Sequence, residues 1–296
     1  MTNRHVGVSD ELRVQKVCQQ QLRTIEMKLG NIIAGQANAL MKREPTVTER
    51  SLLLVATVAK LRECASAILH LGKLGYVDEM SILLRTMVEL TINVCYLQYA
   101  SDEELSRYLH HDPIAGYIAL QDMSRASKGS MQVPHELATR VKQMATDAKN
   151  SSGLLLDSRV WNVNRQTLHQ RASIVDEKTD RTDFAGMLAL VYVTASGYVH
   201  GGYKTLHKHA LYLTHGEVDH PLRTMFGVNN VIHGVGYVQL ILARYFAGRF
   251  DLSTQLINEL AQEGELISNT SHRDYQLHRK SKQPKKGTRL QTKTPE

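Results

Sequence analysis

The segment VDEMSILLRTMVELTINVCYLQY, Val77–Tyr99, decides the fold of this chain. Its aliphatic residues are distributed almost all the way around a helix, and a helix with that pattern is buried on most of its faces. The segment has neither glycine nor proline, and its leucine, methionine and glutamate residues favour helix. The sequence therefore predicts a central helix that other helices surround.

A second helix precedes this segment. We expect it to begin after Thr46 or Thr48, because either threonine can cap a helix that has Glu49 in its first turn. Gly75 suits the C-terminal end of this helix, which should therefore reach Leu74. Almost no loop is left between the two helices, so they should form an antiparallel hairpin.

Helical spacing continues through most of the chain. No segment alternates apolar and polar residues long enough to indicate a strand. We expect a helix after a Ser101 cap, kinked or restarted at Pro113, and loops at Ser124–Val133 and Asn150–Trp161. The other expected helices are Asp10–Lys42, Pro134–Lys149, a helix from Asp180 or Thr182 to Gly201–Gly202, Pro221–Phe250 and Ser253–Leu266. The sequence thus predicts an all-α bundle of long antiparallel helices over residues 1–271, with a polar insert at about 124–180.

The positive charge of the chain is concentrated at its C-terminal end. Eight Lys and Arg residues and two acidic residues lie between His272 and Glu296, so this tail holds six of the seven net positive charges. The tail has almost no apolar residues, and we expect it to be disordered. A basic tail can attract RNA or another acidic partner, although a purely solubilising role is the simpler interpretation.

Composition excludes several classes of protein. The chain is 42% hydrophobic and 22% charged, which is typical of a globular protein. No uninterrupted apolar run approaches the ~20 residues that span a bilayer, and the first eight residues lack the apolar core of a signal peptide. Three widely spaced cysteines indicate neither disulfides nor a thiolate zinc site. We expect a cytoplasmic protein that does not bind membranes.

Two charged residues interrupt the apolar Val77–Tyr99 helix. Arg85 and Glu89 are four residues apart, and Asn93 continues the same stripe one turn later. We expect Arg85 and Glu89 to form a mutual, largely buried pair. The pair either orients two helices or lets Arg85 present its planar fork to a phosphate or carboxylate while Glu89 holds it in place.

A second polar stripe lies on the helix that begins near Thr182. Tyr192, Ser196 and His200 are spaced by four residues and share one face. A hydroxyl one turn away from a histidine is compatible with a nucleophile and its base. A hydrogen-bonded seam between helices is the alternative interpretation.

The remaining motifs give little support for a metal or a cofactor, and none is expected. The spacing of His207, His209, His215, His220 and His233 does not place two ligands in the His-x-x-x-His arrangement, and no carboxylate pair accompanies them. The chain contains no GxGxxG, Walker, HExxH or GxSxG motif and no zinc-finger or RNP signature.

Three short stretches, in this order, resemble a family of mostly bacterial all-α proteins of unknown function. They are LLRTMVEL at Leu83–Leu90, VWNVNRQTL at Val160–Leu168 and YVTASGYVHGG at Tyr192–Gly202, and the resemblance covers roughly Ser51 to Leu206. The family is similar to the HEPN class of helical bundles, whose active members are metal-independent ribonucleases of toxin and phage-defence systems. The resemblance implies a HEPN-like bundle and a role in defence or stress. A homodimer is a further possible state of the protein.

Two functions follow as hypotheses. In the first, the protein cleaves RNA with His200, Ser196, Arg85 and Glu89 as catalytic residues and Tyr192, Trp161 and Lys204 as binding residues. In the second, it is a non-catalytic interaction module whose buried polar residues are structural. Active HEPN enzymes carry Arg-x4-6-His on a late helix, and the one such spacing here, Arg273 and His278, lies at the start of the tail. A ribonuclease site would therefore have to be built differently.

Overall fold

The computed structural model describes residues 48–74, 76–128, 133–161, 165–192, 196 and 221–250. Over these ranges the regular structure is helical throughout, with no strand, and the predicted all-α class is confirmed. The elements are α2 (Glu49–Leu74), α3 (Val77–Leu97), α4 (Asp102–Ala126), α5 (His135–Ser152), α6 (Leu168–Thr179), α7 (Asp183–Met187), the π-helical turn η1 (Leu188–Tyr192) and α10 (Pro221–Phe250).

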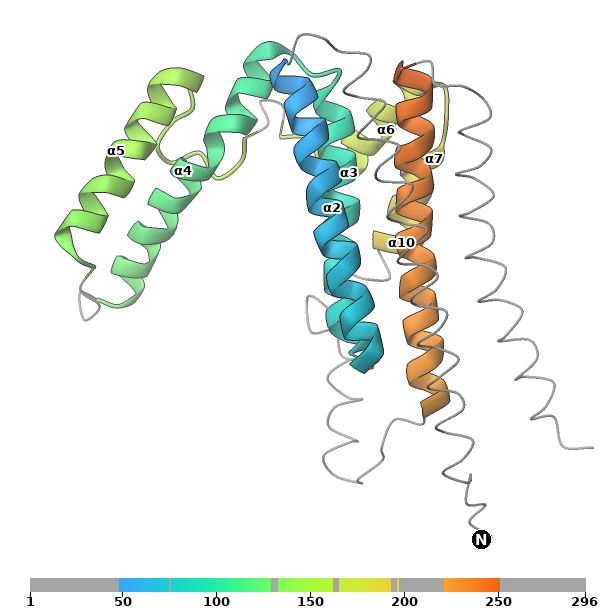
Figure 1. Ribbon diagram of the computed structural model, residues 1–296. Helices are drawn as coiled ribbons and strands as arrows, with labels where there is room; N and C mark the ends of the chain where they lie inside the picture. Colours follow the sequence, from blue (N-terminus) through green and yellow to red (C-terminus); the bar gives the residue numbers. More distant parts are fainter. Residues whose placement is uncertain are drawn as a thin grey trace, which may run out of the picture.

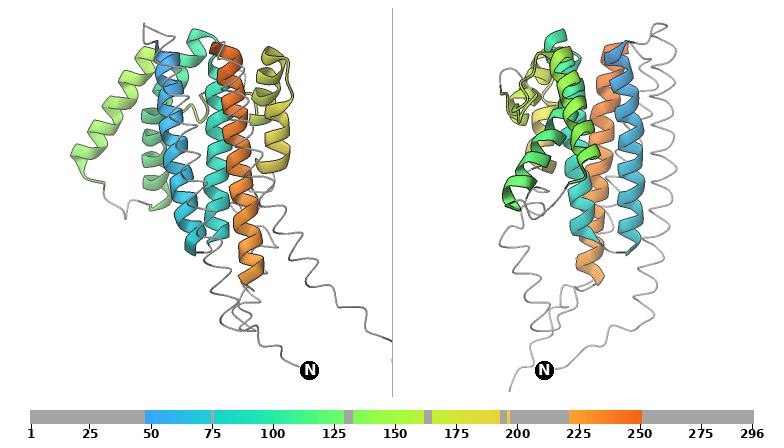
Figure 2. Two further views of the ribbon diagram at one scale, coloured as in Figure 1. Left: turned by 45° about the vertical axis from the view of Figure 1, so that its right-hand side comes forward. Right: turned by 90° about the vertical axis from the view of Figure 1, so that its left-hand side faces the viewer.

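Three long helices, α2, α3 and α10, form the centre of the molecule and lie side by side in Figures 1 and 2. As predicted, α3 is buried on most faces, and its residues Met80, Met87 and Ile92 are completely inaccessible to solvent. Together with α6, α7, η1 and the first turns of α4, these helices surround one large apolar core. We call this assembly the main bundle.

Helices α3 and α10 run parallel and lie unusually close together. Gly227 faces Val77 and Gly234 faces Leu84, so the two contacts follow one another in the same order along both helices. A Cβ atom on Gly234 would lie 2.6 Å from Cδ2 of Leu84, a distance that real Cβ atoms essentially never show. Glycine at this position therefore sets the separation of the two helices.

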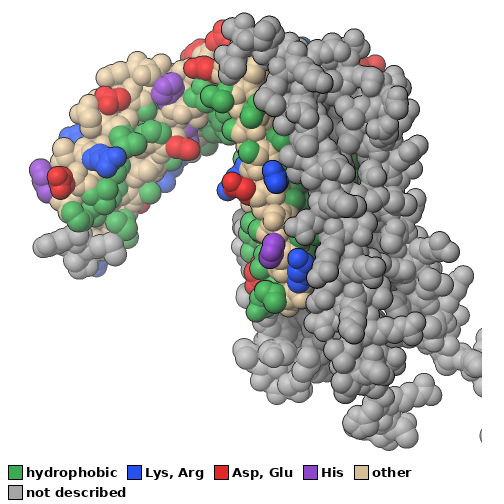
Figure 3. Space-filling view, in the orientation of Figure 1, with side chains coloured by type: hydrophobic (Ala, Val, Ile, Leu, Met, Phe, Trp, Pro, Cys, Tyr) green, Lys and Arg blue, Asp and Glu red, His purple; other side chains and the backbone are tan. Residues whose placement is uncertain are grey.

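Helix α4 belongs to two different cores. Its first turns contribute Leu105, Tyr108 and Leu109 to the main bundle. Beyond Pro113, Ile114 and Ile118 pack instead against α5 and the residues after it in a separate small cluster, which is completed by Ala145, Ala148 and Leu154. We call α5 and the part of α4 after Pro113 the arm. Figure 1 shows the arm projecting from the main bundle, and Figure 3 shows a hollow between them.

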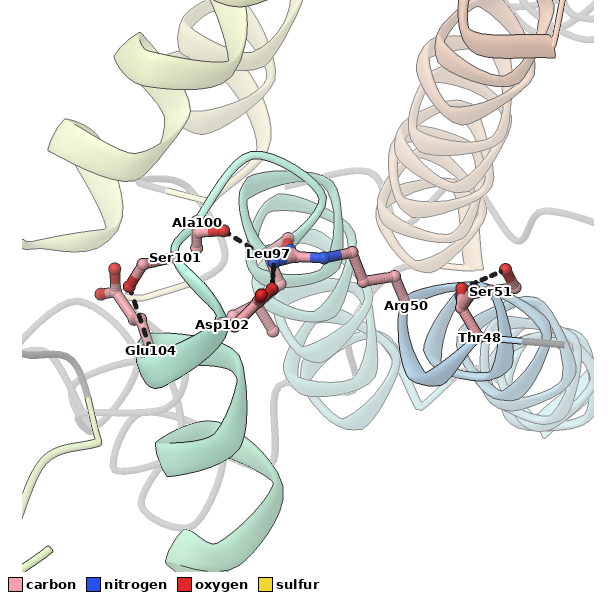
Figure 4. A network of polar contacts seen from close by, with 8 residues as sticks. All are labelled: Thr48, Arg50, Ser51, Leu97, Ala100, Ser101, Asp102 and Glu104. Atoms are coloured by element: carbon pink, nitrogen blue, oxygen red, sulfur yellow. Dashed lines mark hydrogen bonds and ion pairs between the residues drawn. The ribbon is translucent and has the colours of Figure 1, made fainter. Parts of the chain in front are cut away.

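The turn between α3 and α4 is held by Arg50 of α2, as Figure 4 shows. The Arg50 guanidinium donates through Nη1 to the carbonyl of Leu97, and through Nη2 to the carbonyl of Ala100 at 2.8 Å and to Oδ1 of Asp102 at 2.7 Å. The hydroxyl of Ser101 accepts the N–H of Glu104 at 3.2 Å, so the predicted Ser101 cap is confirmed. One arginine thus fixes the end of α3 and the start of α4.

Most of the predicted helices in the described ranges are present. The α2–α3 hairpin and α10 are as expected, and α5 runs three residues beyond the predicted Lys149. Of the two alternatives predicted at Pro113, a kink or a restart, the restart is wrong, because α4 is one continuous helix through Pro113. Proline supplies no N–H, so α4 lacks only the hydrogen bond to the carbonyl four residues earlier.

Several sequence predictions lie outside the described residues. They concern the helices Asp10–Lys42 and Ser253–Leu266, the helix end at Gly201–Gly202, and the basic tail from His272. The division into a domain over 1–271 and a tail stays a prediction. Within the described residues, α3 alone is long and apolar enough to cross a membrane by length and composition. Most of its apolar window is buried inside the protein, as expected for a core helix.

Candidate functional site

Arg85, Glu89 and Tyr192 form a compact polar cluster between α3 and η1. Nε of Arg85 donates to Oε1 of Glu89 at 2.9 Å, and Nη2 of Arg85 donates to the Tyr192 hydroxyl at 2.8 Å. The guanidinium carbon also lies 4.7 Å from the centre of the Tyr192 ring. The predicted Arg85–Glu89 pair is confirmed, and the structure adds Tyr192 to it.

The two charges of this pair differ in exposure. The Arg85 side chain is 16% exposed, whereas that of Glu89 is 39% exposed, so the prediction of a largely buried pair is correct only for the arginine. Burial by itself lowers the pKa of Arg85, but the hydrogen bond and the charge of Glu89 outweigh burial and raise it. Glu89 therefore provides the counter-charge for a nearly buried guanidinium.

Tyr192 is held in its protonated form by the same carboxylate. Burial raises the pKa of its phenol, and the hydrogen bond and charge of Glu89 raise it further, against the opposite effect of Arg85. The phenol stays protonated at neutral pH, where its oxygen accepts the hydrogen bond of Arg85 and its single proton is directed towards Glu89. It comes from a π-helical turn, an irregularity that is frequent at functional sites.

Ser196 lies one turn beyond Tyr192, as the sequence spacing predicts. Its hydroxyl donates to the backbone carbonyl of Tyr192 at 2.8 Å, which leaves its oxygen available as an acceptor. The other two predicted site residues of this segment, His200 and Lys204, lie outside the described residues. The structure thus brings Arg85, Glu89, Tyr192 and Ser196 to one region of the main bundle.

Asn93 begins a second polar cluster one turn further along α3. Its Oδ1 accepts a hydrogen bond of 2.5 Å from Nη1 of Arg171, on α6. The Arg171 guanidinium lies 5.1 Å from the ring centre of Trp161, a cation–π distance. Trp161, predicted to be a binding residue, is therefore a platform for an arginine that the sequence did not single out.

Aromatic side chains fix Trp161 in this second cluster. The ring of Tyr108 packs edge-on against it, with centres 5.0 Å apart, and the ring of Tyr96 lies tilted at 6.3 Å. The Tyr96 hydroxyl donates at 2.8 Å to Oε2 of Glu104, a carboxylate that is only 5% exposed. Burial and this hydrogen bond raise the pKa of Tyr96.

The segment that carries Arg171 does have a sequence signal, which the hydrophobic pattern did not reveal. Thr167 and Gln170 form a capping box: the Thr167 hydroxyl accepts the Gln170 N–H at 3.2 Å, and Oε1 of Gln170 accepts the Thr167 N–H at 2.8 Å. A threonine followed three residues later by glutamine is a helix-start signature. This signature predicts the start of α6, which lies within the predicted polar insert.

Among the described residues, no group of three His, Cys, Asp or Glu side chains lies close enough together to hold a metal ion. His207, His209, His215 and His220 lie outside these residues, and His233 is exposed on α10. The chemistry that the two clusters offer is that of hydrogen-bond donors and fixed positive charge. These groups suit a phosphate or a carboxylate.

Comparison with protein families places the chain in one of them. It belongs to a family of unknown function, DUF5677, which matches residues 51–217, more than half of the chain. This range includes both polar clusters, and the resemblance to an uncharacterised helical family is confirmed at that level. No curated protein and no solved structure matches the chain.

Proposed function

We propose that this protein binds the phosphodiester backbone of RNA at the Arg85–Glu89–Tyr192 cluster and cleaves it without a metal ion, as HEPN-like ribonucleases do. The observation that carries the proposal is the convergence of a guanidinium and a protonated phenol, 2.8 Å apart, beside a partly exposed carboxylate. Arginine matches the geometry of phosphate oxygens, and Glu89 positions it.

The reaction assigned to the cluster is attack of a ribose 2′-hydroxyl on the adjacent phosphorus, with departure of the 5′-oxygen. His200 takes the proton from the attacking hydroxyl or gives one to the leaving oxygen. Arg85 stabilises the negative charge that develops on the phosphorane, and Tyr192, whose hydroxyl accepts a hydrogen bond from Arg85, holds the guanidinium in position. Ser196 accepts a hydrogen bond at the edge of the cluster. The basic tail adds unspecific attraction for the strand.

The test is cleavage of structured and single-stranded RNA by the full chain and by its His200→Ala variant. We expect a loss of about 100-fold or more in rate, since a general acid or base contributes ~10²–10⁴-fold. His135→Ala, at an exposed position on the arm, is the matched control and should cleave at the wild-type rate. Inert wild-type protein, together with a lowered melting temperature for His200→Ala, would reject the proposal.

A second function, a non-catalytic interaction module, is favoured by a different observation. Ser196 already donates to its own helical turn, and Arg85 already has a carboxylate partner, as in a structural seam between helices. In that case Tyr192→Phe lowers stability and changes no activity. A gene neighbourhood without defence or stress functions also favours the module over the ribonuclease.

A further inference from the structure

We propose that Arg171 forms a second anion-binding site, separate from the Arg85 cluster, which takes a phosphate group against the guanidinium held between Trp161 and Asn93. That this phosphate belongs to RNA rests on the proposed function. Binding of the phosphate itself does not.

Arg171 has no carboxylate partner in the part of the chain that the structure describes. Its Nη1 donates to the Asn93 amide oxygen, and its Nε lies 3.5 Å from the carbonyl of Thr167. Both acceptors are neutral. Arg85, by contrast, forms an ion pair with Glu89. A partly buried charge without a counter-ion is costly, and a bound anion removes that cost.

The groups around Arg171 do not fully compensate its positive charge for the loss of water. Burial lowers its pKa, and electrostatic interactions with Tyr96, Glu104, Glu89 and Tyr108 counteract burial without offsetting it. Neither carboxylate forms a hydrogen bond or ion pair with Arg171: Glu89 pairs with Arg85, and Glu104 accepts the Tyr96 hydroxyl through Oε2 while its buried Oε1 has no hydrogen-bond partner among the described residues. The surroundings of Arg171 thus still favour an additional negative charge.

The Arg171 guanidinium is held in one position by its neighbours. Trp161 supports one side of the guanidinium and is itself packed by Tyr108 and Tyr96. Asn93 is fixed on the central helix α3, and the capping box of α6 fixes the segment that carries Arg171. A donor that is already in place loses little conformational entropy when its ligand binds.

The position of Arg171 connects it to the proposed RNA site. Glu89 and Asn93 are successive members of the α3 stripe, about 6 Å apart along the helix axis. Arg85 attaches to the first and Arg171 to the second. The two guanidiniums can therefore serve neighbouring phosphate groups of one extended strand.

The experiment uses Trp161 as the reporter, because it is the only tryptophan of the chain. Inorganic phosphate is titrated into the full-length protein at constant ionic strength, with chloride as the reference anion. We expect a saturable change in tryptophan emission with phosphate and none with chloride. Arg171→Gln should weaken the apparent affinity at least tenfold, and Arg171→Lys, which keeps the charge and loses the fork, by a smaller factor.

Arg140→Gln is the matched control, since it removes an exposed arginine of α5, on the arm. It should change the affinity less than twofold. A short oligouridine then identifies the source of the phosphate: displacement of phosphate by the oligonucleotide indicates RNA, and no displacement indicates free phosphate or a mononucleotide.

Wild-type emission that does not respond saturably to either phosphate or oligouridine overturns the inference without any variant. An unchanged affinity in folded Arg171→Gln protein overturns it as well. Phosphate binding at Trp161 in a protein that cleaves no RNA keeps this inference and rejects the proposed function, so the two fail separately.

Discussion

The main bundle and the arm are built from similar amphipathic helices, yet they differ in what they can support. The main bundle buries a large core around α3, and charged groups are held next to it in defined pairs. The arm buries five residues in its own cluster, and its ion pairs, such as Arg125–Asp122, are exposed. A large core can fix the geometry of a desolvated charge, and we therefore place both candidate sites in the bundle.

The largest expected difference between the two regions concerns their cores. Ile92 in the bundle and Ile114 in the arm are both fully buried. Ile92→Ala should destabilise the whole protein by about 3–4 kcal/mol, since it leaves a cavity that the surrounding helices cannot close. Ile114→Ala should mainly open the arm. Thermal melting measures the first effect, and hydrogen exchange of the α5 amides measures the second.

If Ile114→Ala lowers the global melting temperature as much as Ile92→Ala does, with equal exchange across both regions, the arm and the bundle are one cooperative unit.

A second, smaller difference is expected between ion pairs. Arg85→Met should cost about 2–3 kcal/mol, because it removes charge-assisted hydrogen bonds to Glu89 and Tyr192. Arg125→Met on the arm should cost about 0–0.5 kcal/mol, because exposed pairs contribute little. Urea titrations of both variants measure these values. A cost below about 0.5 kcal/mol for Arg85→Met would show that the bundle does not depend on the pair.

The smallest individual effects are expected at two glycines. Gly234→Ala should destabilise by about 1–2 kcal/mol, because its Cβ would press on Leu84. Gly116→Ala, on α4, meets no atom within 4 Å and should stabilise the protein by about 0.5–1 kcal/mol, since alanine favours helix. Equal melting temperatures for both variants would contradict the close α3–α10 contact.

The parts of this fold that sequence predicts are those where one local signal dominates. The aliphatic pattern of α3, the short Gly75 connection and the Ser101 cap give the hairpin and the next helix start. Helix α6 was missed because most of its residues are polar and its buried residues are only Ala172, Val175 and Asp176. A hydrophobic pattern cannot reveal a helix that contributes so little apolar surface.

In the candidate site, too, the sequence predicts the local contacts and not the long-range ones. Spacing by four residues predicts that Arg85 and Glu89 meet, because both lie on one helix. The contacts of Arg85 with Tyr192 and of Arg171 with Asn93 join residues 107 and 78 positions apart, and no local pattern encodes such distances. The sequence predicts Trp161 as a binding residue but gives no indication of Arg171, which lies over its ring.

The parallel pairing of α3 with α10 also determines the order in which the protein can fold. The contacts of Gly227 with Val77 and of Gly234 with Leu84 each close a loop of about 150 residues, whereas the arm closes between neighbouring helices. Local contacts form fast and distant ones slowly. On the ribosome, the arm can therefore form while α3 still lacks α10, and the apolar side of α3 stays open until the last third of the chain has been synthesised.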